Sequence, residues 1–295
     1  MDKKAFPYIL ALGFAWGLNL VASRFGIGQF EPLMWVALRL IISVAAFALF
    51  YAVSPSRSWS RDPMIWRHAG IVGIFATALP LIGFVLALQY QSAGLSALFV
   101  TTSPAVTVII AHFGLDEARL TRATMMGVLV ALGGAILIIA LGETGLPNVA
   151  DANPLGPLFI FGALVSEAIV AVFIRRRMQG YDVFEVTSIR LLSAMVVVVP
   201  IALLMGQVDF SRVDRVGWGA LLFAAVVSTF GAQLLSFYIT RTFGTTAFAI
   251  VGYVVPIVAI IGGVVRLGEM ITLGMAGGMV LIIIGILLVN RGRAA

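Results

Sequence analysis

The chain has 295 residues, of which 61% are hydrophobic and 11% are charged, and its formal net charge is +6. Soluble domains average about 45–50% apolar and about 25% charged residues, so a water-soluble fold of this length could not bury so much apolar surface. The basic residues lie scattered between apolar runs and form no basic stripe, which argues against a nucleic-acid partner. The sequence has no cysteine, which excludes disulfides and thiolate chemistry.

Apolar runs divide the chain into ten segments, each long enough to cross a bilayer core of about 30 Å as a helix. The predicted spans are residues 7–24, 32–52, 69–90, 95–112, 124–141, 155–174, 183–204, 216–240, 245–265 and 272–290. Only residues 91–94 separate the third span from the fourth, and hydropathy barely falls there. The first run has no small-residue cleavage pattern after it, which predicts a retained helix and not a signal peptide.

The distribution of lysine and arginine predicts the orientation of these spans. With the amino terminus inside, thirteen basic residues fall on the inner side: Lys3, Lys4, Arg57, Arg61, Arg67, Arg119, Arg122, Arg175, Arg176, Arg177, Arg241, Arg291 and Arg293. Only four fall outside: Arg24, Arg212, Arg215 and Arg266. The positive-inside rule therefore predicts a multi-pass protein of the bacterial inner membrane with both termini in the cytoplasm.

The second half of the sequence repeats the first. Arg39 recurs as Arg190 at an offset of 151, and Pro104 recurs as Pro256 at an offset of 152. Because each half holds five spans, the second half must enter the bilayer from the opposite side. We predict an all-α integral membrane fold in which ten transmembrane helices form two inverted five-helix repeats around a central cavity, as in many secondary transporters. The predicted halves are residues 1–141 and 155–295, joined by an outside linker at 142–154.

Several of these residues together resemble a known family. They are the Trp16, Gly17 and Asn19 motif of the first span, the pair Arg39 and Arg190, and the twice-repeated proline with a glutamate 13 residues later, Pro104 with Glu117 and Pro256 with Glu269. This set is similar to the EamA-type transporters of the drug/metabolite transporter superfamily, including amino acid exporters of the YddG type. The resemblance covers essentially the whole chain, and it implies a basket of helices around a central cavity with the fifth and tenth spans peripheral.

The second half departs from the tryptophan-glycine-asparagine motif. At the corresponding place the sixth span carries Val165, Ser166 and Glu167, so the cavity walls are expected to differ chemically. A carboxylate at the bilayer centre costs roughly 2.5–3.5 kcal/mol on insertion scales, so Glu167 should face a wet cavity or a partner. It is a candidate for binding a substrate ammonium group or a coupling proton. A structural ion pair between helices is the alternative.

Two arginines and two prolines are candidates for gating. Arg39 and Arg190 each lie roughly 10 Å into their spans, Arg39 toward the outside and Arg190 toward the inside. Each suits a gate or contact with a substrate carboxylate, while snorkelling or permanent pairing is the alternative. Pro104 and Pro256 interrupt equivalent helices and suit paired hinges, although a fixed kink would need the same residues.

Polar and aromatic side chains within the spans complete the predicted substrate site. Trp16 and Asn19 share one helix face, which must point inward because an amide facing lipid would be unpaired. The predicted substrate-binding set is Trp16, Asn19, Ser103, Glu167, Gln233 and Tyr253. These groups suit a small zwitterion or a planar ring. Ordinary hydrogen bonding between helices is the alternative, especially for the hydroxyl.

Two further features concern helix ends and helix contacts. Glu117 and Glu269 precede the fifth and tenth spans, and we expect each to cap the helix that follows it. Gly274 and Gly278 in the tenth span have GxxxG spacing, which allows close helix contact within the chain or between copies of it. Both a monomer and a homodimer therefore remain open.

We predict a secondary transporter that exports small metabolites, amino acids above all, by alternating access, with the substrate and membrane lipids as its partners and no cofactor or metal. The alternative is an exporter of drugs and other cationic compounds with the same fold. An integral membrane enzyme is disfavoured because the only histidines, His68 and His112, belong to no HExxH motif and the sequence has no GxSxG elbow. A channel is disfavoured because no charge ring or carbonyl filter is evident. The sequence has no Walker motif, so we expect no ATP hydrolysis by this chain.

Overall fold

A computed structural model describes residues 3–54, 59–114, 121–147, 152–206 and 208–294 of the chain. Over these residues the regular secondary structure is entirely helical. Ten helical stretches within them are long and apolar enough to cross a membrane: Phe6–Gly26, Pro32–Val53, Pro63–Ala87, Ala93–Gly114, Arg122–Ala140, Leu155–Arg177, Val183–Met205, Arg215–Gly244, Ala247–Leu267 and Leu273–Arg291. The predicted fold class is therefore confirmed.

Several spans consist of more than one helical element. In the first half the elements are η1 (Lys3–Ala5), α1 (Phe6–Gly26), α2 (Pro32–Val53), α3 (Pro63–Gly73), η2 (Ile74–Ala78), α4 (Leu79–Ala87), α5 (Ala93–Thr101), α6 (Ser103–Gly114) and α7 (Arg122–Ala140). In the second half they are α8 (Leu155–Arg177), α9 (Val183–Met205), α10 (Arg215–Leu222), η3 (Phe223–Gly231), α11 (Ala232–Leu267) and α12 (Leu273–Ala294). The eighth and ninth spans meet inside α11 at Gly244, whose φ of 85° requires glycine and breaks the helical path.

The third span begins earlier than its hydropathy indicates. Asp62 accepts a hydrogen bond from the N–H of Met64 at 2.8 Å, and Pro63 occupies the first helical position. This combination starts a helix whatever the polarity of its first turn. The boundary between the third and fourth spans lies where the repeat predicts it, because α4 ends at Ala87 and Ser92 caps α5.

Acidic residues cap equivalent helices at equivalent positions in the two halves. Glu31 and Asp182 cap the second and seventh spans at an offset of 151. Asp62 and Asp214 cap the third and eighth spans at an offset of 152. Equivalent helices therefore begin at equivalent residues, and the repeat seen in the sequence is also a structural repeat.

A π-helical segment interrupts both the third and the eighth span. These segments are η2 and η3, and Thr77 of η2 stands 152 residues before Thr229 of η3. Such segments widen the helix locally and are frequent at functional sites. The two halves therefore share a distortion of the backbone as well as their helix starts.

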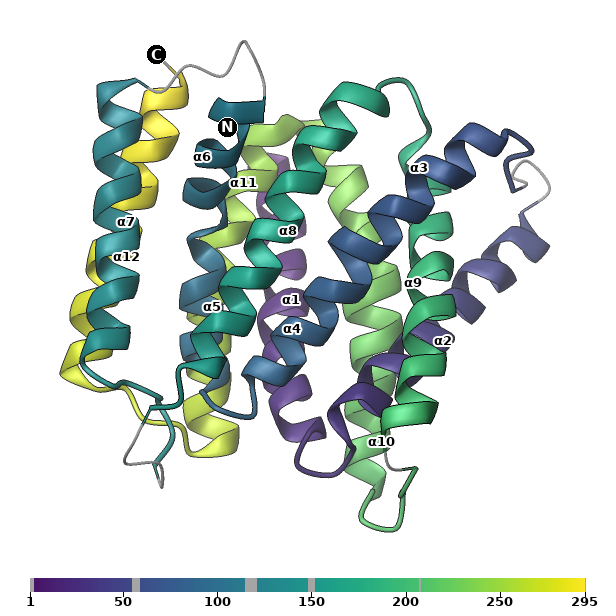
Figure 1. Cartoon of the computed structure of the whole chain (residues 1–295), viewed down its shortest axis with the longest axis horizontal. Helices are drawn as coiled ribbons and strands as arrows, with labels where there is room; N and C mark the ends of the chain where they lie inside the picture. The colour runs from purple at the N-terminus through teal and green to yellow at the C-terminus, as the bar shows by residue number, and fades with distance from the viewer. Residues whose placement is uncertain (1–2, 55–58, 115–120, 148–151, 207, 295) are drawn as a thin grey trace.

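The helices of the two halves interleave around the centre of the molecule. The helix α1 packs against α11, α8 packs against α4 and α6, and α2 packs against α9. The fifth and tenth spans, α7 and α12, pack against each other at one edge, on the left in Figure 1. This edge position agrees with the peripheral placement that the family resemblance implies.

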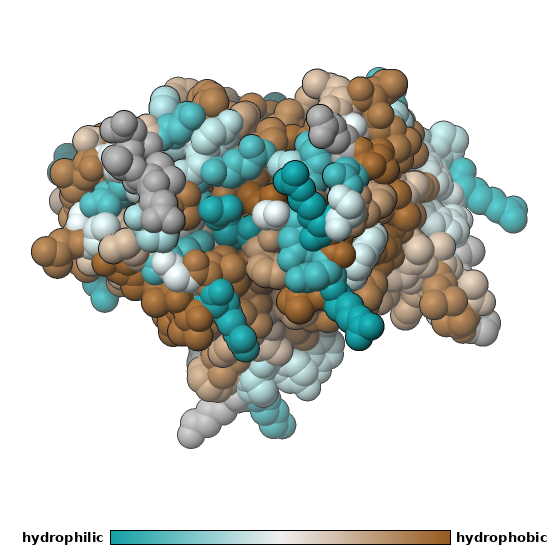
Figure 2. Space-filling model, turned by 90° about the horizontal axis from the view of Figure 1, so that it is seen from below, coloured by the Kyte–Doolittle hydropathy of each residue, from teal (hydrophilic) through white to brown (hydrophobic). Residues whose placement is uncertain are grey.

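Both chain ends lie at the same end of the helices, at the top of Figure 1. Figure 2 views the opposite end, where hydrophilic residues gather over the middle and hydrophobic residues lie along much of the rim. An apolar rim around a polar middle is the distribution expected of helices that face lipid on the outside and enclose a polar interior.

The expectation that Glu269 caps the tenth span is wrong. Its carboxylate accepts hydrogen bonds from the backbone N–H groups of Ala93 at 2.7 Å and Gly94 at 3.2 Å, so it caps the fourth span. The tenth span is capped instead by Thr272, whose Oγ1 accepts from the N–H of Met275 at 3.1 Å. A threonine immediately before the helix reaches its first-turn donors more directly than a glutamate four residues away. Glu117 lies outside the described residues.

The small residues of the tenth span pack inside the molecule. A Cβ atom at Gly278 would lie 2.9 Å from the carbonyl oxygen of Gly134, and one at Gly134 would lie 2.8 Å from the carbonyl oxygen of Gly278. Gly274 faces Leu141 at the end of α7. The GxxxG stripe therefore serves the contact between α7 and α12.

Candidate functional site

A cavity of about 670 Å³ lies between the two halves. Its lining comes from every span except the fifth, as far as the described residues show. Pockets for small molecules usually enclose roughly 300–1,000 Å³. The central cavity therefore has the volume of a small-molecule site.

Most of the residues predicted for binding and gating lie in this one cavity. Its lining includes Trp16, Asn19, Arg39, Ser103, Pro104, Glu167, Arg190, Gln233 and Tyr253. Pro256 is buried in α11 and is not among the lining residues. Residues chosen separately from seven spans thus converge on one space, while their roles in binding and gating stay predictions.

The cavity extends toward the end of the molecule that carries both termini. Its lining reaches Phe248, next to the start of the ninth span, and Asn290, next to the end of the tenth. At the opposite end the loops are bonded to one another, since Ser92 N–H donates to the Thr144 carbonyl at 2.8 Å and Met270 N–H donates to the Gly145 carbonyl at 2.9 Å. These bonds, with the Glu269 cap, hold that end together.

Arg39 is buried, with 5% of its surface exposed, and it is tied to the opposite half of the chain. Its Nε donates to Thr229 Oγ1 at 2.7 Å, and that hydroxyl donates in turn to the carbonyl of Ala224 at 2.8 Å. Ser43, one turn further along α2, donates to the carbonyl of Ala225 at 2.9 Å. The π-helical segment η3 is therefore bonded to α2 at two consecutive turns.

Arg190 has a different environment from its counterpart. Its Nε is buried without a hydrogen-bond partner, and the hydroxyl of Thr77, also buried, has none either among the residues with described positions. Leaving a buried donor or acceptor unpaired costs about 1–3 kcal/mol, and more for a charged group. Both side chains line the central cavity, so a ligand there can supply the missing partners.

Glu167 faces the cavity from α8. Its neighbour Ser166 donates a hydrogen bond to the carbonyl of Phe75 in η2, which fixes this turn of α8 against the third span. The charge of Glu167 attracts that of Arg190, yet no hydrogen bond or ion pair joins the two within the described part of the chain. The cavity therefore presents separated charges of both signs.

Aromatic and amide groups form the rest of the polar wall. The rings of Trp16 and Phe248 meet edge to face at a centroid distance of 5.9 Å. Asn290 Nδ2 donates to the hydroxyl of Tyr253 at 2.6 Å, and Asn19 Oδ1 is buried without a donor in the described structure. The unpaired amide oxygen of Asn19 can accept a hydrogen bond from an ammonium group.

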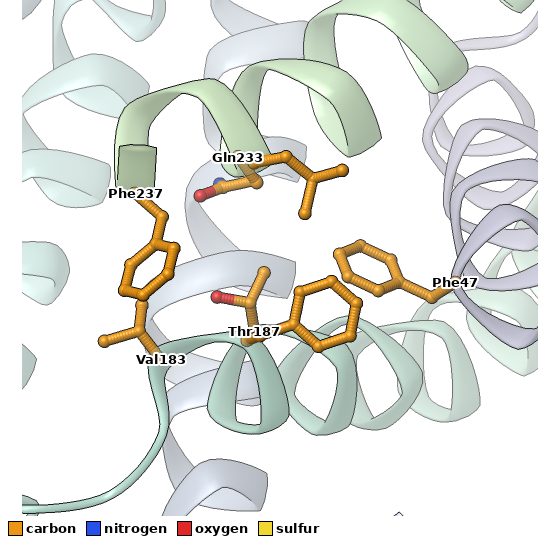
Figure 3. Close-up of a pocket in the computed structure, with 7 residues that line it drawn as sticks. Phe47, Val183, Thr187, Gln233 and Phe237 are labelled. Carbon is orange, nitrogen blue, oxygen red and sulfur yellow. The ribbon is translucent and has the colours of Figure 1, made fainter. Parts of the chain in front are cut away.

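A second, much smaller pocket lies beside the central cavity. In Figure 3, Gln233 of α11 faces Thr187 of α9, with Phe47 of α2 at one end and Phe237 and Val183 at the other. Its volume is about 10 Å³, which is space for roughly one water molecule. Gln233 lines both spaces, and only the central cavity has room for a substrate.

Sequence reasoning did not single out three of the residues that shape this cavity. Thr77 belongs to no motif, but the repeat makes it the counterpart of Thr229, which lies 152 residues later. Thr229 belongs to no motif, and nothing local in the sequence indicates its bond to Arg39. Asn290 lies in the span expected to be peripheral, which contributes this residue and Ile286 to the lining.

Ten spans in two inverted repeats around a polar cavity form an architecture that many membrane transporters share. Within the described ranges no group of three or more histidine, aspartate or glutamate side chains could hold a metal ion. The sequence profile of the "EamA-like transporter family" matches residues 3–140 and again residues 154–291. The chain belongs to this family of transporters.

Relatives of full length support the same assignment. A protein of Archaeoglobus fulgidus named "Uncharacterized transporter" is 23% identical, over 99% of this chain and 100% of its own. Proteins named "Probable amino-acid metabolite efflux pump" from Salmonella typhimurium and Escherichia coli are 26% and 25% identical, each over 97% of this chain and 94% of its own. A crystal structure 18% identical in sequence superposes with a TM-score of 0.68 over 100% of this chain and 99% of its own, which shows the shared fold.

Proposed function

We propose that this transporter exports amino acids and related small metabolites across the bacterial inner membrane by alternating access. The observation that carries the proposal is the pair of separated charges in the central cavity, Arg190 and Glu167, which match the carboxylate and ammonium groups of an amino acid. The names of the two efflux pumps support the same substrate class. The inverted repeat supports alternating access, because exchanging the conformations of two such halves turns an inward-facing cavity into an outward-facing one.

Transport in reconstituted vesicles tests the substrate class. Proteoliposomes should release preloaded amino acids faster than protein-free vesicles, and the panel should include cationic drugs, with and without a pH gradient. Two arginines and one glutamate line the described cavity, so a lipophilic cation meets net positive charge and should move more slowly than an amino acid. Transport of the cationic drugs alone would favour the alternative.

Replacing Glu167 by glutamine should slow amino acid transport. The change keeps the shape of the side chain and removes the charge that pairs with an ammonium group, an interaction worth roughly 1.5–3 kcal/mol or about 10- to 100-fold in rate. Initial rates measured across pH report both the loss and any change in proton dependence. The control is Glu185→Gln at the start of α9, outside the cavity lining, which should transport at the wild-type rate. Equal rates for Glu167→Gln and wild type at every pH would remove Glu167 from the mechanism.

The proposed orientation places both termini and the loop between α8 and α9 in the cytoplasm. The native sequence has no cysteine, so single thiols report cleanly on exposure. Ser211→Cys, before α10, should react with a membrane-impermeant maleimide in intact cells, while Gln179→Cys, after α8, should react only after permeabilisation. Both positions are exposed. Labelling of both variants in intact cells would contradict the inverted arrangement.

A further inference from the structure

The two halves place an arginine and a threonine at equivalent positions, but only one pair is bonded. Arg39 and Arg190 are 151 residues apart, and Thr77 and Thr229 are 152 apart. Arg39 Nε donates to Thr229 Oγ1 at 2.7 Å. Arg190 Nε and Thr77 Oγ1 are both buried, and neither has a hydrogen-bond partner in the described part of the chain.

Separation of the helices does not explain this difference. The third span packs directly against α9, since a Cβ atom at Gly73, the last residue of α3 before η2, would lie 2.8 Å from Cβ of Ser193 and 3.1 Å from the carbonyl carbon of Arg190. Thr77 lies about one turn after Gly73, and it lines the central cavity together with Arg190. The Nε of Arg190 therefore remains unpaired although the backbone of Arg190 lies against the span that carries Thr77.

We propose that Arg190 and Thr77 form the subsite that holds the carboxylate of the transported molecule. A guanidinium presents a planar set of donors that matches a carboxylate, and the threonine hydroxyl adds a donor beside it. Arg39 is not assigned to this subsite because its Nε already donates to Thr229 Oγ1. That hydrogen bond joins α2 to η3. The assignment rests on the proposed transport function and narrows it to substrates that bear a carboxylate.

Two other residues of the cavity lining suit the other end of such a substrate. Glu167 attracts positive charge, and the amide oxygen of Asn19 is buried without a donor among the described groups. An ammonium group there satisfies both, while an amine without a carboxylate leaves Arg190 unpaired. The subsite therefore predicts that an amino acid binds more tightly than its carboxamide. The carboxamide should in turn bind more tightly than the amine from which the whole carboxyl group has been removed.

The test compares matched ligands on the purified full-length protein. Binding of the twenty standard amino acids is measured by calorimetry, and each amino acid that binds is compared with its carboxamide. Wild type should prefer the acid by roughly 10- to 100-fold, as expected for a hydrogen bond to a charged group. Arg190→Gln should bring this ratio close to one. Thr77→Val should lower the ratio and Thr77→Ser should restore it, and these two substitutions change little of the packing.

The matched control weakens the same contact between α2 and η3 at a residue outside the cavity lining. Ser43→Ala should lower the midpoint of thermal unfolding, because it removes the hydrogen bond from Ser43 to the carbonyl of Ala225, yet leave the ratio of acid to carboxamide at the wild-type value. Equal binding of acid and carboxamide by wild type, or an unchanged ratio in Arg190→Gln and Thr77→Val, would overturn the subsite alone. If wild type binds none of the twenty amino acids, the proposed function fails and the subsite fails with it.

Discussion

Replacing Gly285 by leucine should destabilise the folded protein more than any other single change considered. Gly285 is buried where α12 crosses α7, and a Cβ atom there would lie 2.6 Å from the carbonyl oxygen of Gly127. The opposing atoms belong to the helix backbone, so no side-chain rotation can relieve the clash and the two helices must move apart. The cost should reach or exceed the upper end of the roughly 1–3 kcal/mol typical of overpacking. The measurement is the midpoint of thermal unfolding of the detergent-solubilised protein.

The same substitution at Gly277 is the matched control. Gly277 lies in the same helix, it is exposed, and a Cβ atom there would meet nothing within 4 Å. Both variants gain the roughly 1 kcal/mol of helix propensity that separates glycine from leucine, so the difference between them isolates the contact with α7. Similar unfolding midpoints for the two variants would show that α7 and α12 do not approach this closely.

The sequence predicts the helices well because lipid imposes a simple condition on them. Every backbone donor in a span must bond within its helix, so hydropathy and length nearly determine where the spans lie. The exceptions arise from local chemistry: Asp62 and Pro63 start the third span six residues early, and the π-helical segments η2 and η3 have no signature in hydropathy.

The residues of the cavity could be predicted for a related reason. A polar or charged side chain within a span must avoid lipid, so Asn19, Glu167 and Arg190 have few places to lie other than the centre. Which of them pair with each other depends on side-chain rotamers and on the exact crossing of helices. The bond from Arg39 to Thr229, and the lack of one between Arg190 and Thr77, could therefore be found only in the structure.

Glu269 illustrates the same limit at a helix end. Its spacing from Pro256 is conspicuous in the sequence and places it before the tenth span, yet its carboxylate reaches across to the fourth. A residue in a loop can cap any helix whose amino terminus lies within reach of its side chain, and sequence distance does not select among them.

Replacing Glu269 by alanine should cause the second large loss of stability. Glu269 has 7% of its surface exposed, and its carboxylate accepts hydrogen bonds from the N–H groups of Ala93 and Gly94. Removing it leaves two buried donors without a partner, at a cost of about 1–3 kcal/mol each. It also removes a bond between the two halves of the chain. The unfolding midpoint should fall clearly below that of Glu185→Ala, a control at the start of α9 whose carboxylate makes no hydrogen bond in the described structure.

Glu269→Gln separates the hydrogen bonds from the charge. Glutamine retains one acceptor oxygen, so this variant should fall between wild type and Glu269→Ala at neutral pH. Burial raises the pKa of the Glu269 carboxyl above its ordinary value of 4.5, although the N–H groups of Ala93 and Gly94 and the charge of Arg24 act in the opposite direction.

The raised pKa fixes the sign of the pH dependence. The folded protein binds this proton more tightly than the unfolded chain does, so the stability contributed by Glu269 is fully present below the ordinary pKa and is lost as the pH rises through the folded-state pKa. The advantage of wild type over Glu269→Gln should therefore shrink as the pH rises above about 4.5. Unfolding midpoints of both proteins measured across this range provide the check. An advantage that grows with pH would mean that the N–H donors and Arg24 outweigh burial, and that the carboxylate form is the one the fold prefers.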